Sequence, residues 1–290
     1  MFEYLALFQG EFPVFVTITA LMFGLIIGSF LNVVIHRMPL MQERELDIQA
    51  NEILGNDIKP DDEPFNLVFP NSHCPACKHE IRAWENIPLF SYAYLKGKCS
   101  ACKIHISARY PSVELLTGIL TAIVISVFGA SPLGLAACVL TWGLISLALI
   151  DYDTYFLPDD ITLPLLWLGL SVNFFTLITS LSDAFLGACI GYLTFWLVFQ
   201  AFKLITGKEG MGYGDFKLLA MLGAWMGWQA LPLIIILSSF TGALIGGILI
   251  FKGREKAKPI PFGPLLALAG WISLIWGKQL TSAYLQYAAF

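Results

Sequence analysis

Two aspartates lie at the edges of apolar segments, where a carboxyl group could do chemistry. Asp215 ends the Gly-Tyr-Gly-Asp turn at 212–215, directly before an apolar helix. Asp151 ends the apolar run 144–150. A carboxylate in hydrocarbon is costly, so its presence there favours a functional role. A helix cap is the alternative reading of Asp215, because aspartate is a good N-cap residue.

Two carboxyl groups in one partly dry site could cleave a peptide bond. They cannot both ionise easily, so one of them keeps a proton. The ionised group can then activate a water molecule, while the protonated group polarises the peptide carbonyl. We therefore predict Asp151 and Asp215 as a catalytic pair. The nearby Asp159 and Asp160 precede a helix, and capping is enough to explain them.

Four of the six cysteines form two C-x2-C pairs on either side of residues 78–98. They are Cys74, Cys77, Cys99 and Cys102. Two such pairs typically bind one zinc ion tetrahedrally through four thiolates. A closed four-cysteine site leaves no position open for water, so we expect the zinc to be structural.

The composition indicates a multi-pass membrane protein. The chain is 57% hydrophobic and only 13% charged, whereas about a quarter of the residues of soluble domains are charged. It has no basic excess that would indicate nucleic-acid binding. We predict an all-α fold with about eight transmembrane helices and a small zinc-binding loop domain. The expected spans are 12–35, 112–130, 132–150, 161–181, 183–205, 216–228, 230–251 and 262–282.

The distribution of basic residues predicts the orientation in the membrane. Lysine and arginine in short loops mark the cytoplasmic side. Eight crossings with an outside N-terminus put all but Lys278 of the 17 basic residues on that side. The same topology brings Asp151 and Asp215 to the cytoplasmic side, together with the cysteine pairs.

The whole set of motifs resembles the bacterial prepilin peptidases, also called type IV leader peptidases, of the GxGD intramembrane aspartic protease family. The matching segments, in chain order, are 28–33, the two cysteine pairs, 109–111 with Glu114, 151–160 and 212–215. The resemblance covers most of the chain. It implies catalytic roles for Asp151 and Asp215.

That family cleaves the leader of type IV prepilins and pilin-like secretion proteins (pseudopilins) after a glycine, on the cytoplasmic side. It then methylates the new N-terminal residue with S-adenosylmethionine. This chain has no Rossmann-type glycine fingerprint, so the methyl donor is implied by resemblance alone. Gly97 and Lys98 are the candidate residues for its site, and a turn before the second cysteine pair is the alternative.

The resemblance also implies the organisation and location of the chain. We predict a first transmembrane helix over 1–36, a cytoplasmic loop domain with the zinc site over 37–110, and a transmembrane protease core over 111–290. The protein is expected in the bacterial inner membrane, in contact with the lipid bilayer, with both termini periplasmic. A proton-coupled transporter is the alternative use of membrane carboxylates, but no repeated halves support it.

Overall fold

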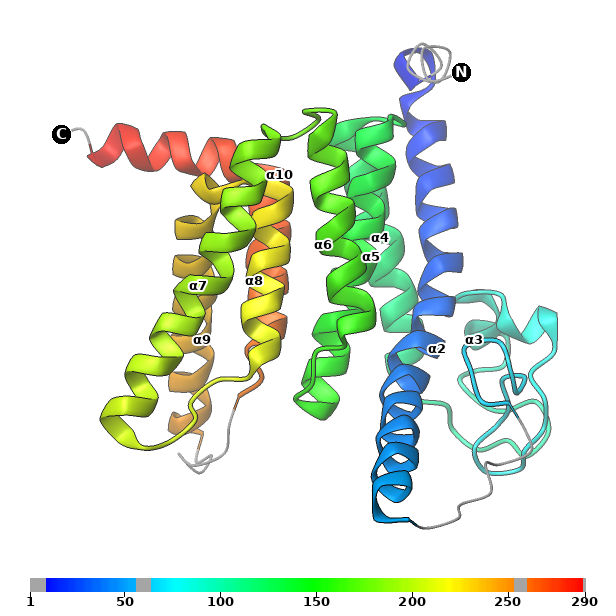
Figure 1. Cartoon of the computed structure of the whole chain (residues 1–290). Coiled ribbons are helices and arrows are strands. Elements are labelled where there is room, and N and C mark those ends of the chain that lie inside the picture. The colour runs from blue at the N-terminus through cyan, green and yellow to red at the C-terminus, as the bar shows by residue number, and fades with distance from the viewer. Residues whose placement is uncertain (1–8, 56–63, 253–259, 289–290) are drawn as a thin grey trace. The chain divides into compact units, whose positions relative to one another are not determined.

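The computed structural model of the protein describes residues 9–55, 64–252 and 260–288 (Figure 1). Within these residues every regular element is a helix, and extended pairing is limited to two isolated bridges, His73–Glu80 and Lys98–His105. The predicted all-α class is therefore confirmed. The chain forms two compact units, Met1–Ser131 and Pro132–Phe290.

The first unit is built on a pair of long helices. Its elements are α2 (Pro13–Leu54), the 3-10 turn η1 (Ala83–Asn86), α3 (Phe90–Tyr94) and α4 (Arg109–Phe128). Helix α2 has 42 residues, a length of about 63 Å. Because the hydrocarbon core is only about 30 Å thick, much of α2 must extend beyond it.

Helix α2 continues past the end of the predicted span at residue 35. Pro39 lies inside it, where proline removes one backbone donor and normally bends or ends a helix. The residues that follow include good helix formers, such as Gln42, Glu43 and Glu45, and they continue the helix. It ends only at Gly55, which adopts the left-handed conformation with φ of 69°.

Two glycines one helical turn apart allow α2 and α4 to approach closely. A Cβ atom on Gly24 would lie 2.8 Å from the Cα of Gly118, and one on Gly28 would lie 2.7 Å from the Cα of Glu114. Small residues at this spacing are typical of helix pairs packed in membranes. Part of the predicted family segment 28–33 therefore serves helix packing.

Glu114 connects this helix pair to the polar loop. Its buried carboxylate accepts a hydrogen bond of 2.9 Å from the amide of Leu89. Leu89 has a positive φ of 58°, a conformation that costs energy in a residue other than glycine. The carboxylate of Glu114 therefore stabilises the entry into α3.

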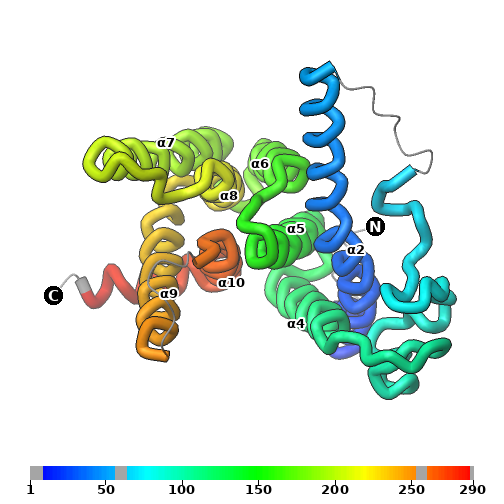
Figure 2. The backbone as a smooth tube through the Cα atoms, turned by 90° about the horizontal axis from the view of Figure 1, so that it is seen from below, coloured from blue at the N-terminus to red at the C-terminus, as the bar shows by residue number. Residues whose placement is uncertain are grey.

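The second unit surrounds a short central helix. Its elements are α5 (Pro132–Thr154), α6 (Asp159–Phe174), α7 (Leu181–Thr206), α8 (Tyr213–Met226), the 3-10 turn η2 (Trp228–Ala230), α9 (Leu231–Phe251) and α10 (Gly263–Ala288). Helix α8 packs against α6, α7 and α10 (Figure 2). Most of its residues from 215 to 225 are buried. This unit holds both predicted catalytic aspartates.

The C-terminal end of α8 is held by hydrogen bonds from the neighbouring helix α6. Near the C-terminal end, the buried Asn173 side chain donates to the carbonyl oxygens of Ala224 and Trp225 at 2.9 and 2.8 Å. Its amide oxygen accepts from the backbone amides of Ile178 and Thr179. These bonds satisfy carbonyl groups that the end of a helix otherwise leaves unpaired.

Among the residues that the structure describes, five helical segments are long and apolar enough to cross a membrane: Pro13–Leu54, Arg109–Phe128, Pro132–Thr154, Leu181–Thr206 and Trp228–Phe251. The multi-pass membrane character is therefore confirmed. Helices α6 and α8 have 16 and 14 residues, fewer than the ~20 that span hydrocarbon without help. The predicted total of eight crossings stays a prediction.

The closest approach of α7 to α8 gives a testable expectation. A Cβ atom on Gly187 would collide with the carbonyl oxygen of Gly223, which is backbone and cannot move aside. Gly187→Ala should therefore destabilise the protein by about 1–3 kcal/mol. Gly247→Ala in α9, where a Cβ atom meets nothing within 4 Å, is the matched control. Thermal unfolding in detergent compares them, and equal midpoints for the two variants would contradict this packing.

Candidate active site

Asp215 lies in the first turn of α8. Gly212 is the N-cap with extended backbone, so Asp215 occupies the third helical position and not the cap itself. The Gly212 amide lies beside its buried carboxylate. A carboxylate at the third helical position faces the unpaired amides of the first turn, which favour a negative charge. The carboxyl group therefore contributes to the helix start and also faces the interior.

Asp151 lies in the last part of α5 and is held by the start of α10. Its Oδ2 atom accepts a hydrogen bond of 2.9 Å from the amide of Gly263. A Cβ atom on Gly263 would lie 2.6 Å from the same oxygen, so only glycine allows this approach. The prolines on either side, Pro261 and Pro264, do not by themselves indicate that Gly263 binds Asp151.

The fold brings the two predicted aspartates together. Both side chains are buried, with relative exposures of 6% for Asp151 and 8% for Asp215, and the two carboxyl groups lie close enough to interact electrostatically. Helix α10 packs against both α5 and α8 and so connects the two. Two buried carboxyl groups within reach of each other can share one proton. This arrangement is suited to activating a water molecule against a peptide carbonyl.

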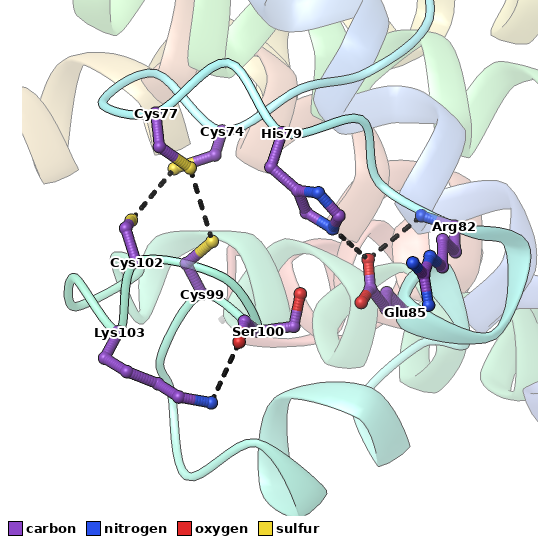
Figure 3. Close-up of polar contacts among 9 residues, drawn as sticks. All are labelled: Cys74, Cys77, His79, Arg82, Glu85, Cys99, Ser100, Cys102 and Lys103. Carbon is purple, nitrogen blue, oxygen red and sulfur yellow. Dashed lines mark hydrogen bonds and ion pairs between the residues drawn. The ribbon is translucent and has the colours of Figure 1, made fainter.

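The four predicted metal-binding cysteines also come together, within the first unit (Figure 3). All four sulfur atoms lie within 4.8 Å of one another. The Cys74–Cys102 and Cys77–Cys99 sulfur atoms are 3.8 and 3.9 Å apart. Sulfur ligands placed tetrahedrally at about 2.3 Å from a zinc ion would be about 3.8 Å apart. The cluster could therefore bind a metal ion of that size.

Each cysteine pair forms the same tight turn. The amides of Lys78 and Lys103 donate to the carbonyl oxygens of Cys74 and Cys99 at 2.9 and 3.1 Å. Both lysines have positive φ angles, of 58° and 61°. The turn points its backbone amides at the first sulfur atom of each pair, a geometry that favours a thiolate.

The protonation of the cysteines reflects these amides. Hydrogen bonds from the amides of Cys77 and Ala76 lower the pKa of Cys74 to about 6, and those of Cys102 and Ala101 lower the pKa of Cys99. The Ile104 amide also favours the thiolate of Cys102, but burial and the neighbouring sulfur atoms raise its pKa to about 11. All four neighbouring sulfur atoms would therefore ionise together only with a cation among them.

Glu85 supports the cluster from the side. Its carboxylate accepts from the Arg82 amide at 3.0 Å, interacts with the side chain of Ser100, and lies 3.5 Å from the Nε2 atom of His79 (Figure 3). Burial disfavours its charge, but these three partners outweigh burial and lower its pKa. Glu85 thus joins the segment after the first cysteine pair to the second pair. No motif in the sequence indicated this role.

The predicted methyl-donor residues lie at the start of the second cysteine turn. Gly97 has a positive φ of 67°, and a Cβ atom there would lie 2.9 Å from the ring of Tyr92. Its carbonyl oxygen accepts from the Ile106 amide at 2.8 Å, and Lys98 forms the bridge with His105. These contacts account for Gly97 as a turn residue. They do not test a role in binding a methyl donor.

Comparison with known proteins identifies the family. Residues 22–128 match the sequence model described as Bacterial Peptidase A24 N-terminal domain, and residues 138–247 match that of the Type IV leader peptidase family. No solved structure matches the chain.

Several relatives align with nearly the whole chain. A prepilin leader peptidase/N-methyltransferase of Stutzerimonas stutzeri is 55% identical over 282 residues, covering 97% of this chain and 98% of that protein. The protein of the same name in Pseudomonas aeruginosa is 55% identical over 291 residues, covering 100% and 99%. One from Aeromonas hydrophila is 54% identical over 266 residues, covering 91% and 92%. This chain therefore belongs to the type IV leader peptidase family.

Proposed function

We propose that this protein is an intramembrane aspartic endopeptidase and N-methyltransferase. Its substrates would be type IV prepilins and pilin-like secretion proteins, cleaved after a glycine on the cytoplasmic side, and S-adenosylmethionine would supply the methyl group. The observation that carries the peptidase proposal is the buried, electrostatically interacting pair Asp151 and Asp215, of which Asp151 is held by the amide of Gly263. The names of its relatives support both activities.

In this mechanism the two carboxyl groups divide the work of hydrolysis. The ionised group takes a proton from water, whose oxygen attacks the peptide carbonyl carbon, while the protonated group donates to the carbonyl oxygen. The amide of Gly263 holds the carboxyl group of Asp151 in place throughout. Return of a proton to the departing nitrogen then completes cleavage and restores the pair. Membership of a peptidase family favours this use of the carboxylates over proton-coupled transport.

We propose zinc as the metal of the cysteine cluster, with Cys74, Cys77, Cys99 and Cys102 as its ligands. The sulfur separations of 3.8 and 3.9 Å support this choice. A zinc ion held there would cross-link the two turns of a loop that has few buried apolar side chains. With all four positions taken by thiolates, its role would be structural.

The methyl-transfer activity is supported by the names of the relatives and not by a binding site for the methyl donor among the described residues. At the candidate residues Gly97 and Lys98, the ring of Tyr92 already fills the space over Gly97. We therefore derive no step of methyl transfer from these residues, and their role in binding S-adenosylmethionine stays a prediction.

We propose the bacterial inner membrane as the location, with the aspartate pair and the cysteine loop facing the cytoplasm and both termini in the periplasm. Two observations support this orientation: the distribution of basic residues and the free thiols of the cysteine cluster. Thiols remain reduced on the cytoplasmic side.

The aspartate pair can be tested by substitution with asparagine. Asp151→Asn and Asp215→Asn should each lower prepilin cleavage by about 10³-fold or more, and the double variant should be no worse, because residues that act as a unit are not additive. Asparagine keeps the shape of aspartate, and at position 151 its amide oxygen can still accept the bond from Gly263, so folding should survive. Product mass with a purified prepilin measures cleavage.

Asp153→Asn is the control, since it removes a carboxylate from the same helix as Asp151. It should retain most of the activity. Near-normal cleavage by Asp151→Asn would disprove the assignment of the pair.

The metal site can be tested by metal analysis. The purified protein should contain about one zinc per chain, and Cys74→Ser or a chelator should remove it because a four-thiolate site needs every ligand. Hydrogen exchange should then rise across 64–108, while the helical content stays. Cys189→Ser, which removes an exposed thiol of α7, should leave the zinc in place. Finding no zinc together with four reactive thiols would refute the site.

The orientation can be tested with reporter fusions. A phosphatase that is active only in the periplasm should be active when fused after Phe290. It should be inactive when inserted near Asp57, a position outside the described residues, because basic residues keep the loop in the cytoplasm. The opposite pattern would overturn the proposed topology.

A further inference from the structure

The first turn of α8, which carries Asp215, is held from α6 by an ion pair. The Nζ atom of Lys217 lies 2.8 Å from Oδ1 and 2.7 Å from Oδ2 of Asp159. Asp159 is the first residue of α6. Its carboxylate therefore does more than complement the start of its own helix, the role that the sequence suggested.

A second contact from the same segment presses on the Gly-Tyr-Gly-Asp turn. A Cβ atom on Gly214 would lie 2.8 Å from the Cβ atom of Leu157, and Leu157 is buried. The segment 157–159 therefore touches the residue before Asp215 and also the residue two positions after it. This explains why the turn needs a glycine at 214.

A third contact holds the turn from α7. The ring of Phe216 packs against the rings of Tyr192 and Phe199, with centroids 5.9 and 5.6 Å apart. Phe216 is fully buried. Helix α7 therefore contacts the turn on the side of Phe216, whereas the segment 157–159 contacts it at Gly214 and Lys217.

The helical period shows what these contacts fix. Successive residues are rotated by about 100°, so Lys217 points about 200° from Asp215, nearly the opposite direction. The contacts of Lys217 with α6 and of Phe216 with α7 therefore resist rotation of the turn about the helix axis. The orientation that they set keeps the side chain of Asp215 near Asp151, with which it interacts electrostatically.

We propose that Asp159 and Lys217 are positioning residues for the peptidase reaction. Their ion pair sets the rotation of the first turn of α8, and so places the carboxyl group of Asp215 relative to that of Asp151. This inference rests on the proposed function. It assigns a role to Lys217 and a second role to Asp159, apart from the start of α6.

The expected signature is a loss of rate without an equal loss of stability. The side chains of Lys217 and Asp159 are 32% and 47% exposed, and an exposed ion pair contributes little to folding. A catalytic group displaced by about 1 Å can nevertheless cost about 100-fold in rate. A residue that served folding alone would lower both quantities together.

The test is a double-mutant cycle on prepilin cleavage by the full-length protein. Asp159→Asn and Lys217→Met should each lower kcat roughly 10- to 100-fold, with KM changed less than about twofold. The double variant should match the more damaging single variant, because either change removes the same pair. Lys217→Arg keeps the charge and can bind both oxygens of Asp159, so it should recover most of kcat.

Two matched controls test whether a loss of kcat comes from the Asp159–Lys217 ion pair and not from the removal of any nearby charge. Lys203→Met breaks an ion pair of 2.7 Å with Glu209 at the other end of the α7–α8 connection, and kcat should be unchanged. Asp160→Asn removes a charge from the same turn of α6 while leaving the Asp159–Lys217 contact in place. It should cost much less than Asp159→Asn.

The outcomes distinguish the two levels of inference. A wild-type protein that cleaves no prepilin would contradict the proposed function itself. An active wild type with unchanged kcat in Asp159→Asn and Lys217→Met would overturn the positioning role alone, as would additive losses that follow the unfolding midpoint. If Lys217→Met fails to insert, Asp159→Asn with its Asp160→Asn control decides, since the amide keeps the shape of the side chain.

Discussion

The burial of two carboxyl groups at one end of a helix bundle is the constraint on which the second unit depends. A charge removed from water is costly unless hydrogen bonds replace its hydration. Asp151 receives such a bond from the amide of Gly263, and the amide of Gly212 lies beside the carboxylate of Asp215. At Gly263 a side chain would collide with the carboxylate it binds. The glycines thus make it possible to bury the pair while keeping its geometry fixed.

The first unit faces a different constraint, since its polar loop has little apolar surface to bury. Four sulfur atoms at ligand spacing, together with the hydrogen-bonded carboxylates of Glu85 and Glu114, take the place of a core. Glu85 links the two cysteine turns, and Glu114 fixes the positive φ of Leu89 against α2 and α4. Each carboxylate is bonded to backbone amides that no regular element would otherwise satisfy. The loop is therefore ordered by polar contacts and, we propose, by zinc.

The sequence was informative where chemistry depends on residue type and short spacing. The cysteine pairs predicted a metal-binding cluster, and apolar runs predicted the helices. It was less informative where a contact joins distant segments. Nothing local shows that Gly263 binds Asp151 or that Lys217 binds Asp159, because each pair meets only after the helices pack. The continuation of α2 through Pro39 was missed for another reason, since a single lost hydrogen bond did not outweigh the helix formers that follow.

The shortness of α8 connects the packing to the chemistry. A helix of 14 residues reaches only about 21 Å, so its two ends cannot both reach the surfaces of a hydrocarbon layer about 30 Å thick. Its polar end groups must then be satisfied by protein or by water held within the protein. Asn173 does this at the end of α8. The start of α8 carries Asp215, and the proposed hydrolysis needs water beside that carboxylate. The same shortness that leaves the ends of α8 to be satisfied by protein or by held water would therefore also let water reach the reacting carbonyl.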